Sequence, residues 1–132
     1  MQGLHLTADL RGCAPGAAAM TDPMALRALC VDAVAAAGLG AVAELFHCFA
    51  PASASAPASA PGAQPGGITG VVLLAESHLA VHTWPEMGAV TLDVYVCNYG
   101  GDNSAKAHEL MRLLLAAFAP QQVQQQAMHR GG

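Results

Sequence analysis

The chain has 132 residues and a formal net charge of −4, and only 11% of its residues are charged against 54% that are hydrophobic. This length fits one domain with one core, but it is short for a chain that must enclose a deep cleft alone, so a partner subunit is expected. Five basic residues without a cluster argue against a nucleic-acid partner. Because no apolar run approaches the roughly 20 residues that span a bilayer, we expect a cytoplasmic protein without a membrane partner.

The first third of the chain predicts a strand, a helix and a second strand. Residues 5–10 alternate apolar and polar side chains, which is typical of a half-buried strand. The sequence TDP at residues 21–23 predicts a helix start, and apolar residues then recur at helical spacing until Gly38 ends the helix. Residues 41–49 (AVAELFHCF) predict the second strand.

Residues 51–67 (PASASAPASAPGAQPGG) hold only Pro, Ala, Ser and Gly apart from Gln64. Such a segment has no large apolar side chain to bury against a core, so we expect a flexible loop. A tolerated insertion is favoured over a lid, because nothing in the segment can make a specific contact.

The middle of the chain predicts a meander of strands. Residues 68–75 (ITGVVLLA) are rich in branched side chains and predict a strand buried on both faces. Residues 79–83 and 89–97 alternate apolar and polar side chains, and WPEMG at residues 84–88 predicts the turn between them.

The last third predicts a helix and a short strand. Residues 102–104 (DNS) can cap a helix that ends before Pro120, and residues 122–128 predict the final strand. The element order β-α-β, β-β, β-α-β predicts the α+β class for a single domain over residues 1–132. We expect a two-layer sandwich in which two helices cover one face of a mostly antiparallel sheet, with repeated β-α-β-β-like units. A second copy of the chain is the simplest cover for the other face and would add the missing cleft wall.

One stretch, LLAESHLAVHTWPE at residues 73–86, places polar residues inside an apolar run. The simplest interpretation is a tight turn at Glu76 and Ser77 between two strands, with the histidines satisfied by local hydrogen bonds. Two interpretations with chemical content compete with it.

The first is a metal site. His78 and His82 share a strand face by parity, and His47 or Cys48 could join them. Two histidines four residues apart are a familiar zinc pair on a helix, however, and Pro85 with the branched flanks argues against a helix here. We therefore expect no metal.

The second is chemistry on the backbone itself. In a strained turn the Ser77 hydroxyl can attack the preceding carbonyl and convert the Glu76–Ser77 amide into an ester. Elimination then leaves dehydroalanine, which hydrolyses to a pyruvoyl group. A base must take the serine proton and a donor must hold the oxyanion. His82 is near in sequence, and Thr69 on the neighbouring predicted strand offers a hydroxyl.

These segments resemble the prokaryotic S-adenosylmethionine decarboxylase proenzymes, the small pyruvoyl-dependent enzymes of spermidine biosynthesis. The likeness is carried by AESHLAVHTWPE (75–86), GLHLTADLRGC (3–13), LFHCFAP (45–51), LDVYVCNYG (92–100) and SAKA (104–107). It therefore extends over nearly the whole chain, and its central motif is highly specific.

The resemblance implies self-cleavage between Glu76 and Ser77. A β chain of residues 1–76 and an α chain of residues 77–132 would result, with a pyruvoyl group formed from Ser77 at the start of the α chain. This ketone would form a Schiff base with the amine of S-adenosylmethionine, so no external cofactor is implied. The products would be carbon dioxide and decarboxylated S-adenosylmethionine, the aminopropyl donor for spermidine. We expect a homo-oligomer, a dimer of αβ units.

The resemblance also implies roles for single residues. His82 matches the histidine that assists processing, and Cys97 matches the cysteine that returns a proton to the product carbon. A free thiol is mostly protonated at neutral pH, as that role needs. The positions that match the substrate pocket are Phe49, Leu79, Trp84 and Glu86. The aromatic rings suit a sulfonium cation, and the carboxylate suits the ribose hydroxyls.

Two features depart from the family pattern. Thr69 stands where the family has a serine that helps processing, and it keeps the hydroxyl on a stiffer side chain. The insertion at residues 51–67 replaces a shorter segment. Two alternatives stay open at this point: a pyruvoyl-dependent arginine or ornithine decarboxylase on the same scaffold, and an uncleaved, inactive homologue that acts as a binding or regulatory subunit.

Overall fold

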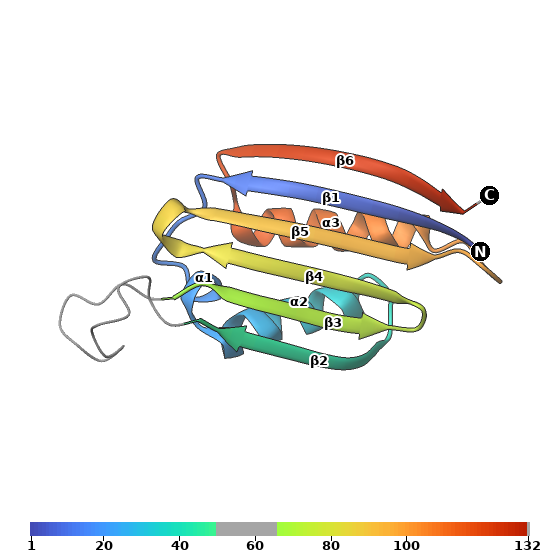
Figure 1. The fold of residues 1–132 in the computed structure, drawn as a ribbon, viewed down its shortest axis with the longest axis horizontal. Coiled ribbons are helices and arrows are strands. Elements are labelled where there is room, and N and C mark those ends of the chain that lie inside the picture. The colour runs from blue at the N-terminus through green and yellow to red at the C-terminus, as the bar shows by residue number, and fades with distance from the viewer. Residues whose placement is uncertain (50–65, 132) are drawn as a thin grey trace.

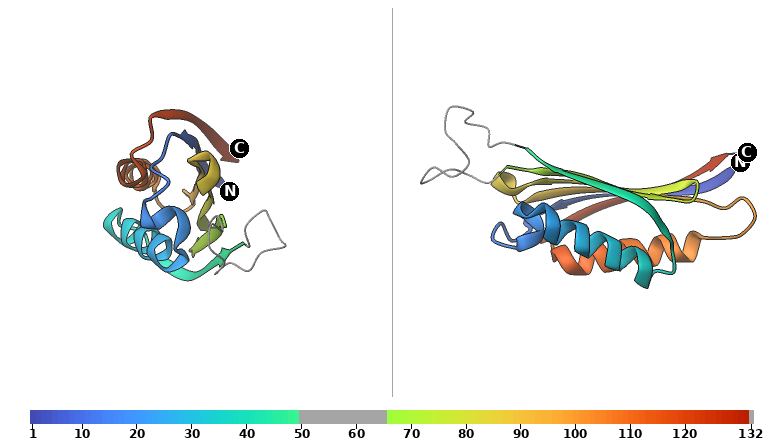
Figure 2. Two further views of the ribbon diagram at one scale, coloured as in Figure 1. Left: turned by 90° about the vertical axis from the view of Figure 1, so that its left-hand side faces the viewer. Right: turned by 90° about the horizontal axis from the view of Figure 1, so that it is seen from below.

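The computed structural model describes residues 1–49 and 66–131, so nearly all of the expected loop 51–67 lies outside the described residues. The elements are β1 (Gln2–Arg11), α1 (Ala18–Thr21), α2 (Pro23–Ala36), β2 (Ala41–Cys48), β3 (Ile68–Leu74), β4 (Ser77–Trp84), the 3₁₀ turn η1 (Pro85–Met87), β5 (Ala89–Cys97), α3 (Ser104–Phe118) and β6 (Gln122–Gly131). They form two layers, with the helices on one face of the sheet (Figures 1 and 2). The predicted α+β sandwich is thereby confirmed.

The described strands form one six-stranded sheet in the order β2-β3-β4-β5-β1-β6. Every neighbouring pair is antiparallel, where the sequence predicted a mostly antiparallel sheet. The first and last strands, β1 and β6, lie side by side, and both chain ends lie at the same end of the sheet (Figure 1). β3, β4 and β5 form the predicted meander at its centre.

The core lies between the sheet and the helices. Alternate residues of each central strand turn toward the helices, because successive strand side chains point to opposite faces. Its buried members include Leu4, Leu6, Leu10, Met20, Leu26, Val34, Ile68, Val72, Leu79, Val81, Leu92, Leu110, Met111, Leu114 and Phe118. Full burial of one leucine contributes roughly 1.5–3 kcal/mol, so this layer accounts for the helices lying on this face.

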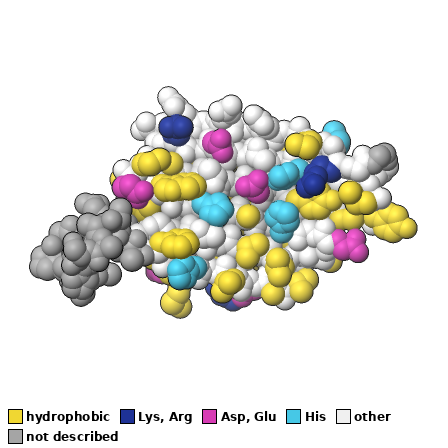
Figure 3. Space-filling view, viewed as in Figure 1, with side chains coloured by type: hydrophobic (Ala, Val, Ile, Leu, Met, Phe, Trp, Pro, Cys, Tyr) yellow, Lys and Arg dark blue, Asp and Glu magenta, His cyan; other side chains and the backbone are white. Residues whose placement is uncertain are grey.

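The opposite face of the sheet is open in the single chain. The prediction that β3 is buried on both faces is wrong for one copy, because the helices cover one face only and Leu73 on the other is 46% exposed. Figure 3 views this open face and shows hydrophobic side chains and histidines across it. No described helix has the length and apolar character needed to cross a membrane.

Two elements differ from the prediction. The sequence did not predict α1, a single turn whose Ala17 start carries no capping side chain. A contact with the sheet stabilises this turn instead, because the buried Thr83 hydroxyl on β4 donates to the Met20 carbonyl at 3.0 Å. The final strand also runs on to Gly131, because it pairs with β1 along its whole length.

Candidate active site

The turn between β3 and β4 holds the backbone at Glu76 in an unusual conformation. Leu74 pairs with Ser77, so only Ala75 and Glu76 connect the two strands. Such a short connection needs positive φ, and Glu76 adopts φ 54° although it is not a glycine. A residue with a side chain is strained in this left-handed region, so the residue on the N-terminal side of the Glu76–Ser77 peptide bond has a strained backbone.

The Ser77 hydroxyl is held by one main-chain group of this turn and one of the neighbouring strand β5. It accepts a hydrogen bond from the Cys97 N–H at 2.9 Å and donates one to the Ala75 carbonyl at 3.0 Å. The oxygen is therefore kept one residue from the strained position, where it accepts one hydrogen bond and donates another.

The Cys97 side chain lies beside the same turn. It is 9% exposed, and its Sγ donates to Glu76 Oε2 at 3.4 Å. The Tyr99 N–H donates to the same sulfur at 3.4 Å. The structure thus brings together Glu76, Ser77 and Cys97, three residues that the sequence analysis selected.

The loop after Cys97 contributes residues that the sequence analysis did not assign to the site. The Asn103 side-chain amide donates to the Cys97 carbonyl at 2.8 Å. The Asn103 N–H donates to Asn98 Oδ1 at 2.7 Å, and the Asn98 amide donates to Ser104 Oγ at 3.0 Å. Asparagine before a helix predicts a cap, so the sequence offered no signal for this use.

A pocket of about 820 Å³ opens onto the sheet face at Ser77. Its lining includes Val71, Leu73, Ser77, His78, Tyr95 and Arg130. The Arg130 guanidinium carbon lies 5.3 Å from the centre of the Tyr95 ring, within the range of a cation-π contact. The pocket therefore combines apolar walls with the Arg130 guanidinium and the Glu76 carboxylate, beside Ser77.

His78 lines this pocket, and His5 and Asp93 lie next to it on the neighbouring strands. His5 Nε2 lies 3.1 Å from Asp93 Oδ1, and the His5 ring is 6.4 Å from the His78 ring. Burial lowers the pKa of His78, and the charges of His5 and Arg130 lower it further, while Asp93 acts in the opposite direction. His78, next to Ser77 in the chain, is therefore biased toward its neutral form.

The remaining predicted residues gather at the other end of the strands. Thr69 pairs with His82 across β3 and β4, and Thr69 Oγ1 lies 3.0 Å from His82 Nδ1. The Trp84 ring lies 6.0 Å from the His82 ring. The Phe49 N–H donates to the carbonyl of Gly67, just before β3 begins.

Two further predicted residues lie close in the chain to this second group. Glu86 lies in η1, directly after β4. The Leu79 side chain is fully buried toward the helices, so only its backbone is available to a pocket on the open face.

The structure does not bring Ser77 and His82 together within one chain. Both lie on β4, five residues apart. At about 3.3 Å per residue this separates them by about 16 Å. Proximity in sequence is therefore not proximity in space here, and a base at His82 cannot reach Ser77 of its own chain.

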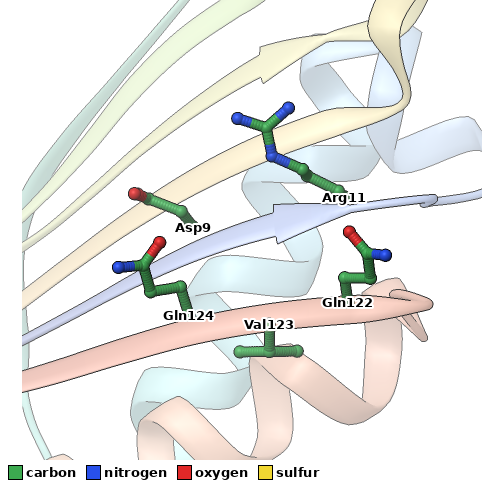
Figure 4. A pocket seen from close by; sticks show the side chains of 5 residues that line it. All are labelled: Asp9, Arg11, Gln122, Val123 and Gln124. Atoms are coloured by element: carbon green, nitrogen blue, oxygen red, sulfur yellow. The ribbon is translucent and has the colours of Figure 1, made fainter.

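Neither of two other features marks a competing site. Among residues 1–49 and 66–131, no three His, Cys, Asp or Glu residues group closely enough to hold a metal ion. A second hollow of about 180 Å³ lies between β1 and β6 and is lined by Asp9, Arg11, Gln122, Val123 and Gln124 (Figure 4). It contains none of the predicted site residues.

The sequence matches a known family over almost its whole length. The family model described as S-adenosylmethionine decarboxylase covers residues 4–131. The S-adenosylmethionine decarboxylase proenzyme of Aquifex aeolicus is 37% identical over 129 residues, which are 98% of this chain and 81% of the relative. The proenzyme of Pyrococcus furiosus is 32% identical over 117 residues, which are 89% of this chain and 73% of the relative.

Solved structures give the same result for the fold. The crystal structure of the adenosylmethionine decarboxylase from Aquifex aeolicus has a TM-score of 0.78 and 35% identity, over 98% of this chain and 90% of that one. The Trypanosoma brucei AdoMetDC-delta26 monomer has a TM-score of 0.54 and 12% identity, over 92% of this chain and 44% of that one, a likeness of fold alone.

Proposed function

Because the chain belongs to the S-adenosylmethionine decarboxylase family, we propose that it is a self-cleaving decarboxylase that converts S-adenosylmethionine to decarboxylated S-adenosylmethionine and carbon dioxide. The product would serve as the aminopropyl donor for spermidine. One observation carries the proposal: the Ser77 hydroxyl lies at a strained turn, 2.9 Å from the main-chain nitrogen of the cysteine expected to donate a proton.

Self-cleavage would start at the Ser77 hydroxyl. This hydroxyl donates to the Ala75 carbonyl, so it must rotate toward the Glu76 carbonyl before it attacks. Attack turns the Glu76–Ser77 amide into an ester, and the positive φ of Glu76 favours any step that releases the turn. Elimination frees the Glu76 carboxylate, and hydrolysis with loss of ammonia leaves the pyruvoyl group. The chains would be residues 1–76 and 77–132.

The residues around Ser77 fit a pyruvoyl group at this position. That ketone supplies an electron sink for the bond to the departing carboxylate, so no external cofactor is expected. Cys97 is the proton donor in this proposal, since its thiol lies at the same turn and donates to Glu76 Oε2. The Tyr99 N–H holds the sulfur from the other side.

Substrate binding would use the group at the other end of β4. Phe49 and Trp84 provide aromatic faces for the sulfonium and the adenine, and Glu86 provides a carboxylate for the ribose hydroxyls. The Leu79 backbone would complete the pocket. The 3.0 Å contact between Thr69 and His82 is the pair that would assist processing, with threonine in place of the serine usual in the family.

A homodimer of αβ units would reunite the two groups. Since about 16 Å separates Ser77 from His82 along β4, a second copy facing the first in the opposite direction would place its His82 end over the first copy's Ser77 end. The open face offers apolar surface for this, with Leu45 71% exposed. A two-fold axis makes both sites equivalent. The cytoplasmic location stays a prediction.

Labelled substrate tests the activity directly. Purified protein should release labelled carbon dioxide from carboxyl-labelled S-adenosylmethionine, and Ser77→Ala should release none. Preferred release from arginine or ornithine would assign a different substrate. Release from none of the three would leave the uncleaved binding or regulatory subunit as the better account.

A further inference from the structure

Asn103 stands where an asparagine side chain usually caps a helix, directly before α3. Among the described residues, its side chain makes no bond to a helix N–H. It turns back and donates from Nδ2 to the Cys97 carbonyl at 2.8 Å. The neighbouring Asp102 accepts the Ser104 N–H at 2.9 Å and so takes over part of the capping. Asparagine is a residue type that caps helices, but here its side chain binds the Cys97 carbonyl instead.

The loop fixes Asn103 in this orientation. Its own N–H donates to Asn98 Oδ1 at 2.7 Å, and the Asn98 amide donates to Ser104 Oγ at 3.0 Å. Its carbonyl accepts the Ala107 N–H at 3.0 Å, the first turn of α3. Asn103 therefore ties the end of β5 to the start of α3, an element anchored in the core.

Cys97 is the last residue of β5, and beyond it the Asn98 N–H donates to the Gln2 carbonyl of β1 at 2.8 Å, so the Asn103 tie is a second hold on this end of the strand. Its N–H contacts the Ser77 hydroxyl at 2.9 Å, and its thiol points to Glu76 at 3.4 Å. A small displacement of the Cys97 carbonyl would move both groups relative to residue 77.

We infer that Asn103 is a positioning residue that sets the direction in which the Cys97 thiol delivers its proton. The inference rests on the proposed decarboxylase function. Once carbon dioxide has left, the electron pair is shared between the substrate carbon and the former ketone carbon of residue 77. A proton on the substrate carbon, followed by hydrolysis, releases the amine product and restores the ketone.

A proton on the carbon of residue 77 has a different outcome. Hydrolysis then leaves alanine at position 77, which keeps the substrate nitrogen, and releases the decarboxylated remainder of the substrate as an aldehyde. The enzyme is then inactive. The two carbons are separated only by the shared nitrogen, so the position of the thiol decides the ratio of turnover to inactivation.

Asn103→Ser separates this role from a structural one. Serine is a good helix cap, so the unfolding temperature should stay unchanged or rise, but its hydroxyl is too short to replace the amide at Cys97. We expect kcat to fall about 10- to 100-fold with little change in KM. Intact mass should show alanine at position 77 accumulating after fewer turnovers than in the wild type.

Asp102→Ala is the matched control at the same helix start. It removes the bond to the Ser104 N–H but leaves the Cys97 contact, so it should lower the unfolding temperature without changing kcat or the number of turnovers before inactivation. Equal losses in this control would assign the effect to the helix start and overturn the inference.

The remaining outcomes are also decisive. Wild-type kcat and wild-type inactivation in Asn103→Ser would overturn the role of Asn103 while the decarboxylase function stands. A folded Asn103→Ser chain that no longer cleaves would overturn the inference, because it would place the effect of Asn103 on the Ser77 hydroxyl that the Cys97 N–H holds and not on the thiol. A wild-type chain that neither cleaves nor decarboxylates refutes the proposed function itself, and this inference with it.

Discussion

Cys97 contacts the proposed cleavage site separately through its main chain and its side chain. Its N–H holds the Ser77 hydroxyl, and its thiol points to Glu76. Cys97→Ala keeps the first contact and removes the second. We expect this variant to cleave into two chains on a denaturing gel but to lose at least about 100-fold in kcat, the lower end of the range for loss of a general acid. Full turnover in the cleaved variant would exclude Cys97 as the proton donor.

His78 provides a test of the electrostatics next to Ser77. Burial and the charges of His5 and Arg130 hold its pKa below the ordinary value of 6.5. NMR titration of the uncleaved Ser77→Ala chain should find it there, and Arg130→Gln should raise it, because a repelling cation is removed. A pKa at or above 6.5, or no response to Arg130→Gln, would contradict this description.

The same shift has a consequence for stability. Since the folded pKa lies below the unfolded one, the unfolded state binds more protons between the two values. Stability should therefore fall as the pH drops below 6.5 and continue to fall down to the folded pKa. In thermal unfolding, His78→Asn should lose less stability than its parent between pH 7 and pH 5. A steeper loss in the variant would show the opposite sign.

At the scale of elements, the β3–β4 hairpin stores strain at Glu76. Glycine tolerates positive φ, so Glu76→Gly should stabilise the uncleaved Ser77→Ala chain by about 1 kcal/mol relative to Glu76→Ala in denaturant unfolding. Glu76→Ala is the control because it also lacks the carboxylate. With Ser77 present, Glu76→Gly should cleave more slowly than Glu76→Ala. Equal cleavage rates would remove strain from the mechanism.

The elements with a strong local signal were predictable. The alternating strands 5–10 and 89–97 and the helix that starts after Asp22 were confirmed, because their periodicity matches the face that they bury. α1 was missed because its contact to Thr83 comes from a distant strand. The hydrogen bond from Asn103 to the Cys97 carbonyl was not predictable either, because an asparagine directly before a helix has the same sequence pattern whether it caps the helix or bonds elsewhere.

At the scale of the molecule, the motif at residues 73–86 contains predicted site residues that lie far from one another within one chain. The sequence analysis took His82 as near to Ser77, but an extended strand separates them by about 16 Å. Whether the open face of the sheet is covered, and by what, depends on association with another chain, which leaves no local pattern in the sequence. The sequence therefore predicted a set of site residues that stays a prediction, and their division into two groups needed the strand register.

Mixed chains test the shared site. Ser77→Ala cannot form the proposed ketone but retains His82, whereas His82→Ala retains Ser77 but lacks the histidine proposed to assist processing. When the two are co-expressed with distinguishable tags, the His82→Ala chain should be cut by its Ser77→Ala partner. No cleavage in the mixture, although each variant folds and pairs, would place the histidine that assists processing in the same chain, whereas cleavage of the His82→Ala chain alone would remove its role.

Intact mass of freshly folded protein tests the central claim most directly. The wild type should give two fragments split between Glu76 and Ser77, with the second fragment blocked at its N-terminus and reactive toward hydrazine. Ser77→Ala should keep the full-length mass. A wild-type chain that remains at full length without a reactive carbonyl would contradict the account.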